Sequence, residues 1–103
     1  MSHLKEMQKT YHITDDQLNG IRDVLEEVRD ATEHGRPYSY QQFEQKVLKI
    51  VPYNYSHHIA QDLAKAFLLD ERYEAEIVAL YENEASMKSL IEDWKEKKSG
   101  EVL

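Results

Sequence analysis

Cysteine is absent from the 103-residue chain, which excludes disulfides, thiol nucleophiles and cysteine-based zinc sites. With only three glycines, a glycine-rich loop that cradles phosphate groups is not available. The longest unbroken apolar run, Ile77 to Tyr81, is far shorter than the roughly 20 residues that a membrane span needs. Basic residues are also in deficit, 13 against 20 acidic ones. The resulting net charge of −7 argues against nucleic acid and against an anionic membrane surface as partners.

The composition supports one folded domain over residues 1–103. Hydrophobic residues make up 41% of the chain, which is enough for a modest core and is not a disordered composition. We interpret residues 1–12 as an N-terminal arm and residues 99–103 as a frayed tail. The first twelve residues contain neither an apolar segment nor a small-residue cleavage site, so we expect a cytoplasmic protein without a signal peptide.

Capping signals and apolar periodicity predict the first confident helix over residues 15–34. Thr14 and Gln17 stand at the spacing of a capping box, and Gly35 supplies the residue that follows a helix end. Gly20, inside this helix, costs roughly 1 kcal/mol relative to alanine. The apolar stripe consists of Leu18, Ile21, Leu25, Val28 and Ala31.

Two further helix starts share the pattern Pro-Tyr-polar-Tyr, at residues 37–40 and 52–55. Ser39 and Gln42 predict a second capping box, for a helix that must stop before Pro52. A third helix is expected to begin near Tyr55. Its apolar positions are Ile59, Leu63, Ala66 and Phe67.

The C-terminal part of the chain carries a heptad stripe with one polar member, and Asp70 is expected to cap the helix that bears it. The stripe consists of Tyr73, Ile77, Leu80, Glu84, Met87, Ile91 and Trp94. An unbroken helix over 71–98 would be about 42 Å long, against a radius of gyration near 13 Å for a domain of this size. Either it breaks near 83–86, with Ser86 as a cap, or its overhang packs on another chain. We therefore predict an all-α bundle of four to five helices whose C-terminal helix is long or broken near 83–86.

Signals for chemistry are weak. His58 and Asp62 lie four residues apart, a spacing that can chelate a metal, and His57 is adjacent, but the sequence nominates no third ligand. The serines stand in no nucleophile motif. We expect no catalytic residue, no cofactor and no bound metal, and we interpret the protein as not an enzyme.

Signals for partner binding are stronger. Tyrosine is enriched at interaction hot spots, and four tyrosines gather at the two loop–helix junctions, where Tyr38 and Tyr53 are expected to pack inward. Six acids between residues 70 and 84 face one base, Arg72, which could steer a basic partner. We expect the second half of the C-terminal helix to form a contact between subunits. The predicted partner-binding residues are Tyr40, Tyr55, Glu74, Met87, Ile91 and Trp94.

Residues 13–81 resemble two groups of small helical proteins from Gram-positive bacteria. The order of elements, with Asp70-Glu71-Arg72-Tyr73 leading into Ile77–Leu80, is similar to the YhaI-like family. The stretch Ile21–Leu25, together with Asp30, Glu33, Gly35 and Tyr53 near His57 or His58, resembles the IreB-like regulators, which are substrates of PASTA-domain kinases. Residues 65–69 stand in the place of the arginine-rich segment of that group. Both resemblances imply a small helical protein that binds other proteins and can form an oligomer.

We accordingly predict a protein-binding or regulatory helical module that self-associates as a homodimer. One alternative is an acidic inhibitor, of the DNA-mimic or immunity-protein type, acting as a monomer on a basic target. A second alternative is a small enzyme or metal protein.

Overall fold

The computed structural model describes residues 2–36, 38–51 and 58–102, and all regular structure among them is helical. The radius of gyration is 13.5 Å and the extents are 42 × 34 × 23 Å. The expected all-α fold is confirmed. The described elements are α1 (His3–Tyr11), α2 (Asp15–Glu33), α3 (Tyr40–Ile50), α4 (Ile59–Leu69), α5 (Glu74–Tyr81), the 3₁₀ turn η1 (Ala85–Met87) and α6 (Lys88–Val102).

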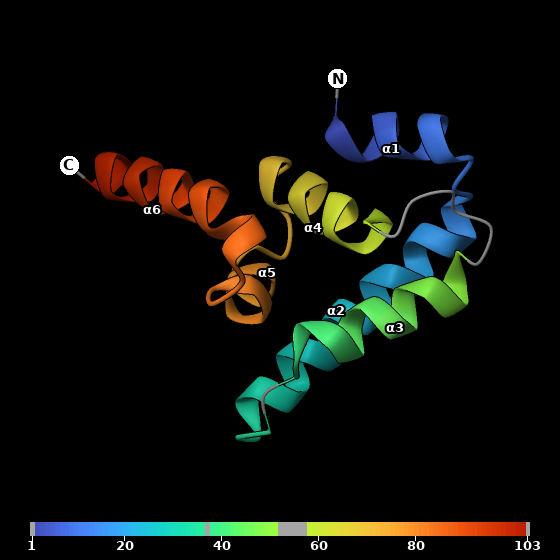
Figure 1. Cartoon of the computed structure of the whole chain (residues 1–103), viewed down its shortest axis with the longest axis horizontal. Coiled ribbons are helices and arrows are strands. Elements are labelled where there is room, and N and C mark those ends of the chain that lie inside the picture. The colour runs from blue at the N-terminus through green and yellow to red at the C-terminus, as the bar shows by residue number, and fades with distance from the viewer. Residues whose placement is uncertain (1, 37, 52–57, 103) are drawn as a thin grey trace.

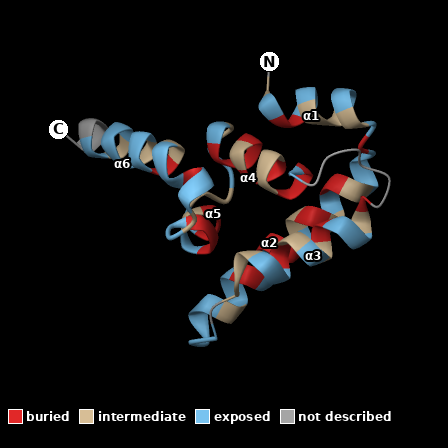
Figure 2. Cartoon of the chain, in the orientation of Figure 1, coloured by how far each residue is buried: buried red, intermediate tan, exposed pale blue. Residues whose placement is uncertain are grey.

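Helix α4 is the central element. Figure 1 shows α2 and α3 side by side as a hairpin, with α1 and α6 on either side of α4. Seven of the eleven residues of α4 are buried, and it packs against α1, α3 and α5. Figure 2 shows buried positions where the helices face one another, whereas the far half of α6 is mostly exposed. The core therefore forms around α4.

Both predicted capping boxes are confirmed. The Thr14 hydroxyl accepts from the Gln17 backbone N–H at 3.1 Å, and the Gln17 side chain accepts from the Thr14 N–H at 2.9 Å. Ser39 and Gln42 make the same reciprocal pair, at 3.2 and 3.0 Å. At the other end of α2, Gly35 adopts a φ of 70°, as the predicted helix end requires.

The N-terminal segment is a packed helix, which corrects the expectation of an arm over residues 1–12. Leu4 is buried in the core, and the Ser2 side chain caps α1 by accepting from the Lys5 N–H at 3.0 Å. The Asp70 carboxylate also accepts from the backbone N–H groups of His3 and Leu4, at 2.8 and 2.9 Å. A helix N-terminus leaves such N–H groups without partners inside the helix, and Asp70 satisfies two of them.

Asp70 thus caps α1, which is far away in the sequence. The prediction that Asp70 caps the helix that follows it is wrong. Asp70 is the C-cap residue of α4, and α5 begins only after Tyr73. Between them Glu71 and Tyr73 adopt positive φ values of 59° and 55°. The Glu71 and Arg72 N–H groups bond back to Leu68 and Phe67, which closes α4 and turns the chain into α5.

The C-terminal helical segment is interrupted near residues 83–86, which is one of the two predicted arrangements. Helix α5 ends at Tyr81, η1 follows, and α6 starts at Lys88. Ser86 is not the cap, because its hydroxyl donates to the Gln61 side chain at 3.1 Å and Glu84 precedes the turn. The break folds Met87 and Ile91 into the core of the same chain. The tail expected to fray from residue 99 is helical as far as Val102.

Candidate functional site

An exposed apolar surface lies across the outer side of α4. Leu69, at the end of α4, is 48% exposed and lines two adjacent hollows. One hollow, of about 130 Å³, lies against α6 and includes Leu90 and Trp94. The other, of about 340 Å³, lies against α1 and includes Met7 and Tyr11. We call these five residues, Met7, Tyr11, Leu69, Leu90 and Trp94, the Leu69 face.

The α6 side of the Leu69 face is fixed by polar contacts to α5 and to the turn before it. The Trp94 indole N–H donates to the Glu74 carboxylate, and the Lys98 ammonium lies 3.4 Å from the same group. Lys97 pairs with Glu71 at 3.2 Å. Trp94 lines the hollow, and its one polar atom is satisfied inside the chain.

The α1 side is held by one longer contact. The Tyr11 hydroxyl donates to the Asp62 carboxylate at 3.4 Å. Burial, followed by the nearby negative charge of Asp62, raises the pKa of Tyr11, so this tyrosine stays protonated in the physiological range. Met7 is partly buried against the core next to it.

The rim of the Leu69 face carries charges of both signs. Glu6 and Lys65 line the hollow on the α1 side, and Asp93 and Lys97 line the hollow on the α6 side. The rim therefore selects neither a purely basic nor a purely acidic partner.

The acids between residues 70 and 84 are used inside the chain. Asp70 caps α1, Glu71 and Glu74 pair with α6, and Glu82 pairs with Lys95 at 3.3 Å. Glu76 is only 8% exposed and accepts from the Arg29 guanidinium at 2.6 Å. The expected steering patch is thus largely occupied by internal partners.

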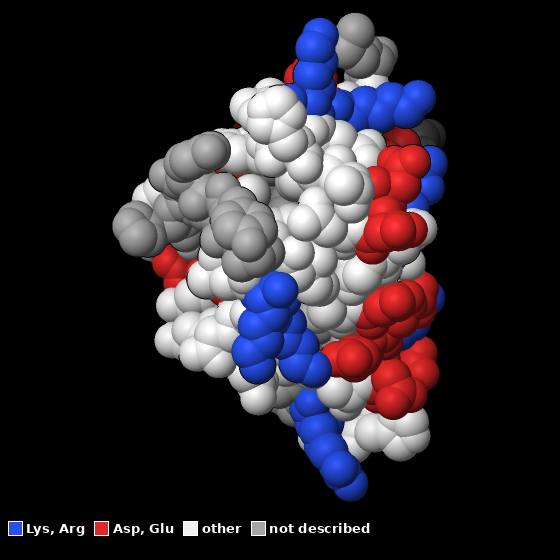
Figure 3. All heavy atoms as spheres, turned by 90° about the vertical axis from the view of Figure 1, so that its right-hand side faces the viewer, with Lys and Arg blue, Asp and Glu red and all other residues white. Residues whose placement is uncertain are grey.

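Helix α2 exposes more acidic charge than the 70–84 segment leaves free. Seven acids of this helix are exposed, against two arginines, although Glu26 pairs with Arg29 and Glu27 pairs with Lys46. On the face that Figure 3 presents, acidic side chains gather along one edge. The seven are Asp15, Asp16, Asp23, Glu26, Glu27, Asp30 and Glu33.

The structure brings together only part of the predicted partner-binding set. Glu74 and Trp94 meet through a hydrogen bond. Tyr40 packs on Tyr81, with ring centroids 5.7 Å apart, and lines neither hollow of the Leu69 face. A hydrogen bond to Glu84 raises the pKa of Tyr40. Tyr55 lies outside the described residues.

Met87 and Ile91 require a correction. Both side chains are buried inside the chain, because the break before α6 folds them onto the core. Neither is exposed to a partner, whereas Leu90 and Trp94 of the same helix are only partly buried. The heptad stripe predicted the burial of Met87 and Ile91 but assigned it to a second subunit.

The candidate metal ligands do not gather. His58 is exposed at the start of α4, Asp62 accepts the Tyr11 hydroxyl, and His57 lies outside the described residues. In the described part of the chain, no group of three or more histidine and acidic side chains could hold a metal ion.

Sequence reasoning missed Leu69 and the α1 residues Met7 and Tyr11. A signal for Leu69 was present, since the run Ala66–Leu69 is apolar on every side of the helix, and such a helix has more than one packed face. Met7 and Tyr11 were missed because the segment that contains them was interpreted as an arm.

Among residues 2–36, 38–51 and 58–102, no helix combines the length and apolarity needed to cross a membrane. Comparison of the chain with protein families, curated proteins and solved structures found no match.

Proposed function

We propose that this chain is a small protein-binding module that self-associates as a homodimer through the Leu69 face. The observation that carries the proposal is the exposure of Leu69 between partly buried aromatic and aliphatic side chains of α1 and α6. Aromatic and aliphatic side chains in shallow hollows are typical centres of protein interfaces. A second copy of this chain is the occupant to which we commit.

The charges on the rim support a second copy over other partners. In a twofold dimer the same surface of both copies forms the interface, so each charge on one copy faces a residue of that surface on the other copy. The rim of the Leu69 face supplies Glu6 and Asp93 as well as Lys65 and Lys97, so a twofold arrangement can set opposite charges against each other. A strongly charged partner of either sign would meet like charges here.

The test is the oligomeric state of the wild type and of Leu69→Glu, measured by size-exclusion chromatography with light scattering. We expect a wild-type dimer. Two half-exposed Leu69 side chains leave water in each dimer, at roughly 0.7–1.5 kcal/mol each, so the variant should dissociate at least ~10-fold more readily. Circular dichroism should show unchanged helix content, because Leu69 is half exposed.

The matched control is Leu48→Glu. Leu48 on α3 is also a large hydrophobic, 41% exposed, but does not belong to the Leu69 face. We expect this variant to remain a dimer. A monomeric wild type at micromolar concentration, or an equal loss of dimer in both variants, would contradict the proposal.

A second candidate function is the binding of a basic partner by α2, favoured by the seven exposed acids on that helix. This retains the acidic-inhibitor alternative but moves its surface from residues 70–84 to α2. Such binding would weaken steeply with salt and with Asp23→Asn and Glu33→Gln. Binding through the Leu69 face would change little with added salt or with these two substitutions. The two proposed functions can therefore be told apart by experiment.

A further inference from the structure

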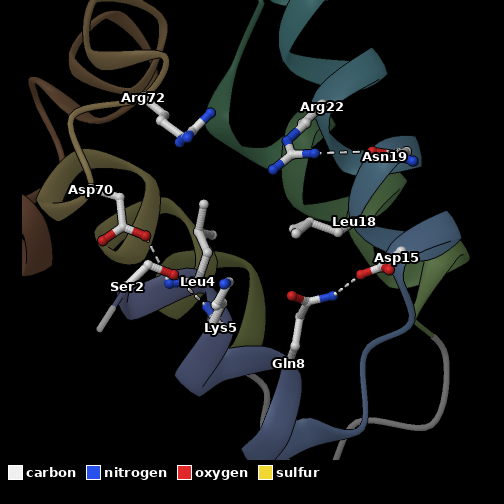
Figure 4. A pocket seen from close by; sticks show the side chains of 10 residues that line it. All are labelled: Ser2, Leu4, Lys5, Gln8, Asp15, Leu18, Asn19, Arg22, Asp70 and Arg72. Carbon is white, nitrogen blue, oxygen red and sulfur yellow. Dashed lines mark hydrogen bonds between the residues drawn. The ribbon is translucent and has the colours of Figure 1, made fainter.

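A hollow of about 670 Å³ separates α1 from the first half of α2 and from the turn after α4 (Figure 4). Leu4 and Leu18 supply its apolar lining, and the amides of Gln8 and Asn19 supply polar groups. Its size falls in the range of small-molecule sites, which is roughly 300–1,000 Å³. It is distinct from the two hollows of the Leu69 face.

Three cationic side chains line this hollow: Lys5 from α1, Arg22 from α2 and Arg72 from the turn before α5. In Figure 4 the ends of Arg22 and Arg72 are directed toward each other. Arg22 donates to the Asn19 side chain at 3.0 Å. In the described part of the chain, none of the three pairs with a carboxylate.

The two carboxylates at the hollow are already engaged. Asp70 accepts from the His3 and Leu4 backbone N–H groups and contacts the His3 ring at 3.0 Å. Asp15 accepts from the Gln8 amide at 2.8 Å. Neither acid pairs with Lys5, Arg22 or Arg72, and the three cations exceed the two carboxylates, so the lining keeps an excess of positive charge.

Like charges directed into one cavity repel each other unless an anion lies between them. Guanidinium groups match the geometry of phosphate oxygens, to which they donate paired hydrogen bonds. A nucleic acid is a poor candidate, because the chain carries a net charge of −7 and α2 exposes seven acids. A small anion can enter the hollow without approaching most of those acids.

We propose that this hollow binds a phosphorylated small molecule, with the phosphate groups held by Arg22, Arg72 and Lys5. The remainder of the ligand lies over Leu4 and Leu18, within reach of the Gln8 and Asn19 amides. The proposal does not depend on self-association through the Leu69 face.

The test is isothermal titration calorimetry of the full chain at low ionic strength with inorganic phosphate, pyrophosphate, ATP and citrate. We expect pyrophosphate and ATP to bind more tightly than phosphate or citrate. Tighter binding of ATP than of pyrophosphate assigns a contribution to the amides and leucines, and equal binding shows recognition through the phosphates alone. Binding of none of the probes, or of citrate as tightly as pyrophosphate, would overturn the proposal.

The variants Arg22→Gln and Arg72→Gln locate the site. Because each guanidinium donates charge-assisted hydrogen bonds to the phosphates, each variant should weaken pyrophosphate binding about 10-fold or more. The matched control is Arg36→Gln, since Arg36 is an exposed arginine that does not line the hollow. Circular dichroism verifies that each variant is folded. Undiminished binding in both site variants, or an equal loss in Arg36→Gln, would show that the phosphates bind elsewhere.

Discussion

Gly20 and Gly35 occupy opposite backbone situations. Gly20 is inside α2, where a Cβ would meet the Ile50 side chain at 3.4 Å, an ordinary contact distance. Gly35 has open space around it but a φ of 70°, which residues with a Cβ rarely adopt. The space near Ile50 therefore decides whether a side chain fits at Gly20, whereas the backbone conformation decides it at Gly35.

We expect Gly20→Ala to raise the free energy of unfolding by up to about 1 kcal/mol, because alanine favours the helix. Gly35→Ala should lower it by about 1 kcal/mol through strain at positive φ. Urea unfolding followed by circular dichroism measures both variants. A loss of stability in Gly20→Ala would mean that Ile50 cannot accommodate even a methyl group.

Glu71 adopts the conformation that Gly35 adopts, but with a side chain. We expect Glu71→Gly to raise the free energy of unfolding by about 1 kcal/mol, because glycine removes the cost of a φ of 59°. The exposed pair with Lys97 contributes little, so Glu71→Gln, which removes only the charge, should change stability by less than about 0.5 kcal/mol. Equal stability of Glu71→Gly and wild type in urea unfolding would contradict the strain argument.

At the scale of elements, Asp70 joins the end of α4 to the start of α1. Burial alone would raise the pKa of the Asp70 carboxyl, but the N–H groups of Leu4 and His3 and the His3 ring outweigh burial and lower it below 3.8. A depressed pKa in the folded state means that the carboxylate stabilises the fold above the unfolded value. That contribution is lost as the pH falls through the folded value.

We therefore expect Asp70→Asn, which keeps one acceptor oxygen but loses the second acceptor and the charge, to lose about 0.5–1.5 kcal/mol of stability at pH 7. The difference from wild type should shrink as the pH falls below 3.8. Thermal unfolding across pH measures this, with the exposed Asp93→Asn as control. A difference that stays constant down to the most acidic pH would show that the charge of Asp70 is not what holds α1.

The capping boxes were predictable because donor and acceptor lie three residues apart, so the local sequence contains the whole interaction. The role of Asp70 was not, since its partners are 66 and 67 residues away. The stripe Met87–Ile91 reported burial correctly, but periodicity does not say whether the covering surface belongs to the same chain. The Leu69 face depends on α1, α4 and α6 together, and no single segment reveals it.

At the scale of the whole molecule, the negative charge is unevenly placed. Helix α2 exposes seven acids against two arginines and has no basic residue in its last turn, where a helix favours positive charge. In α6, by contrast, four acids stand with four lysines. Repulsion within α2 should therefore be one cost of the folded state.

We expect the melting temperature to rise with added salt, which screens this repulsion. The triple variant Asp23→Asn, Asp30→Asn and Glu33→Gln should melt higher at low salt and respond less to salt. A matched control removes the same number of charges from α6, as Glu92→Gln, Asp93→Asn and Glu96→Gln. An equal salt response in the two triple variants would mean that only net charge matters.

Trp94 is the only tryptophan of the chain, and it belongs to the Leu69 face. Indole fluorescence shifts to shorter wavelength when the ring leaves water, so the protein contains its own optical reporter of what covers this surface. Dilution of a dimer should shift the emission to the red, whereas filling the hollow between Arg22 and Arg72 should leave the emission wavelength unchanged. A fluorescence measurement can thus follow the Leu69 face without interference from binding in the hollow between Arg22 and Arg72.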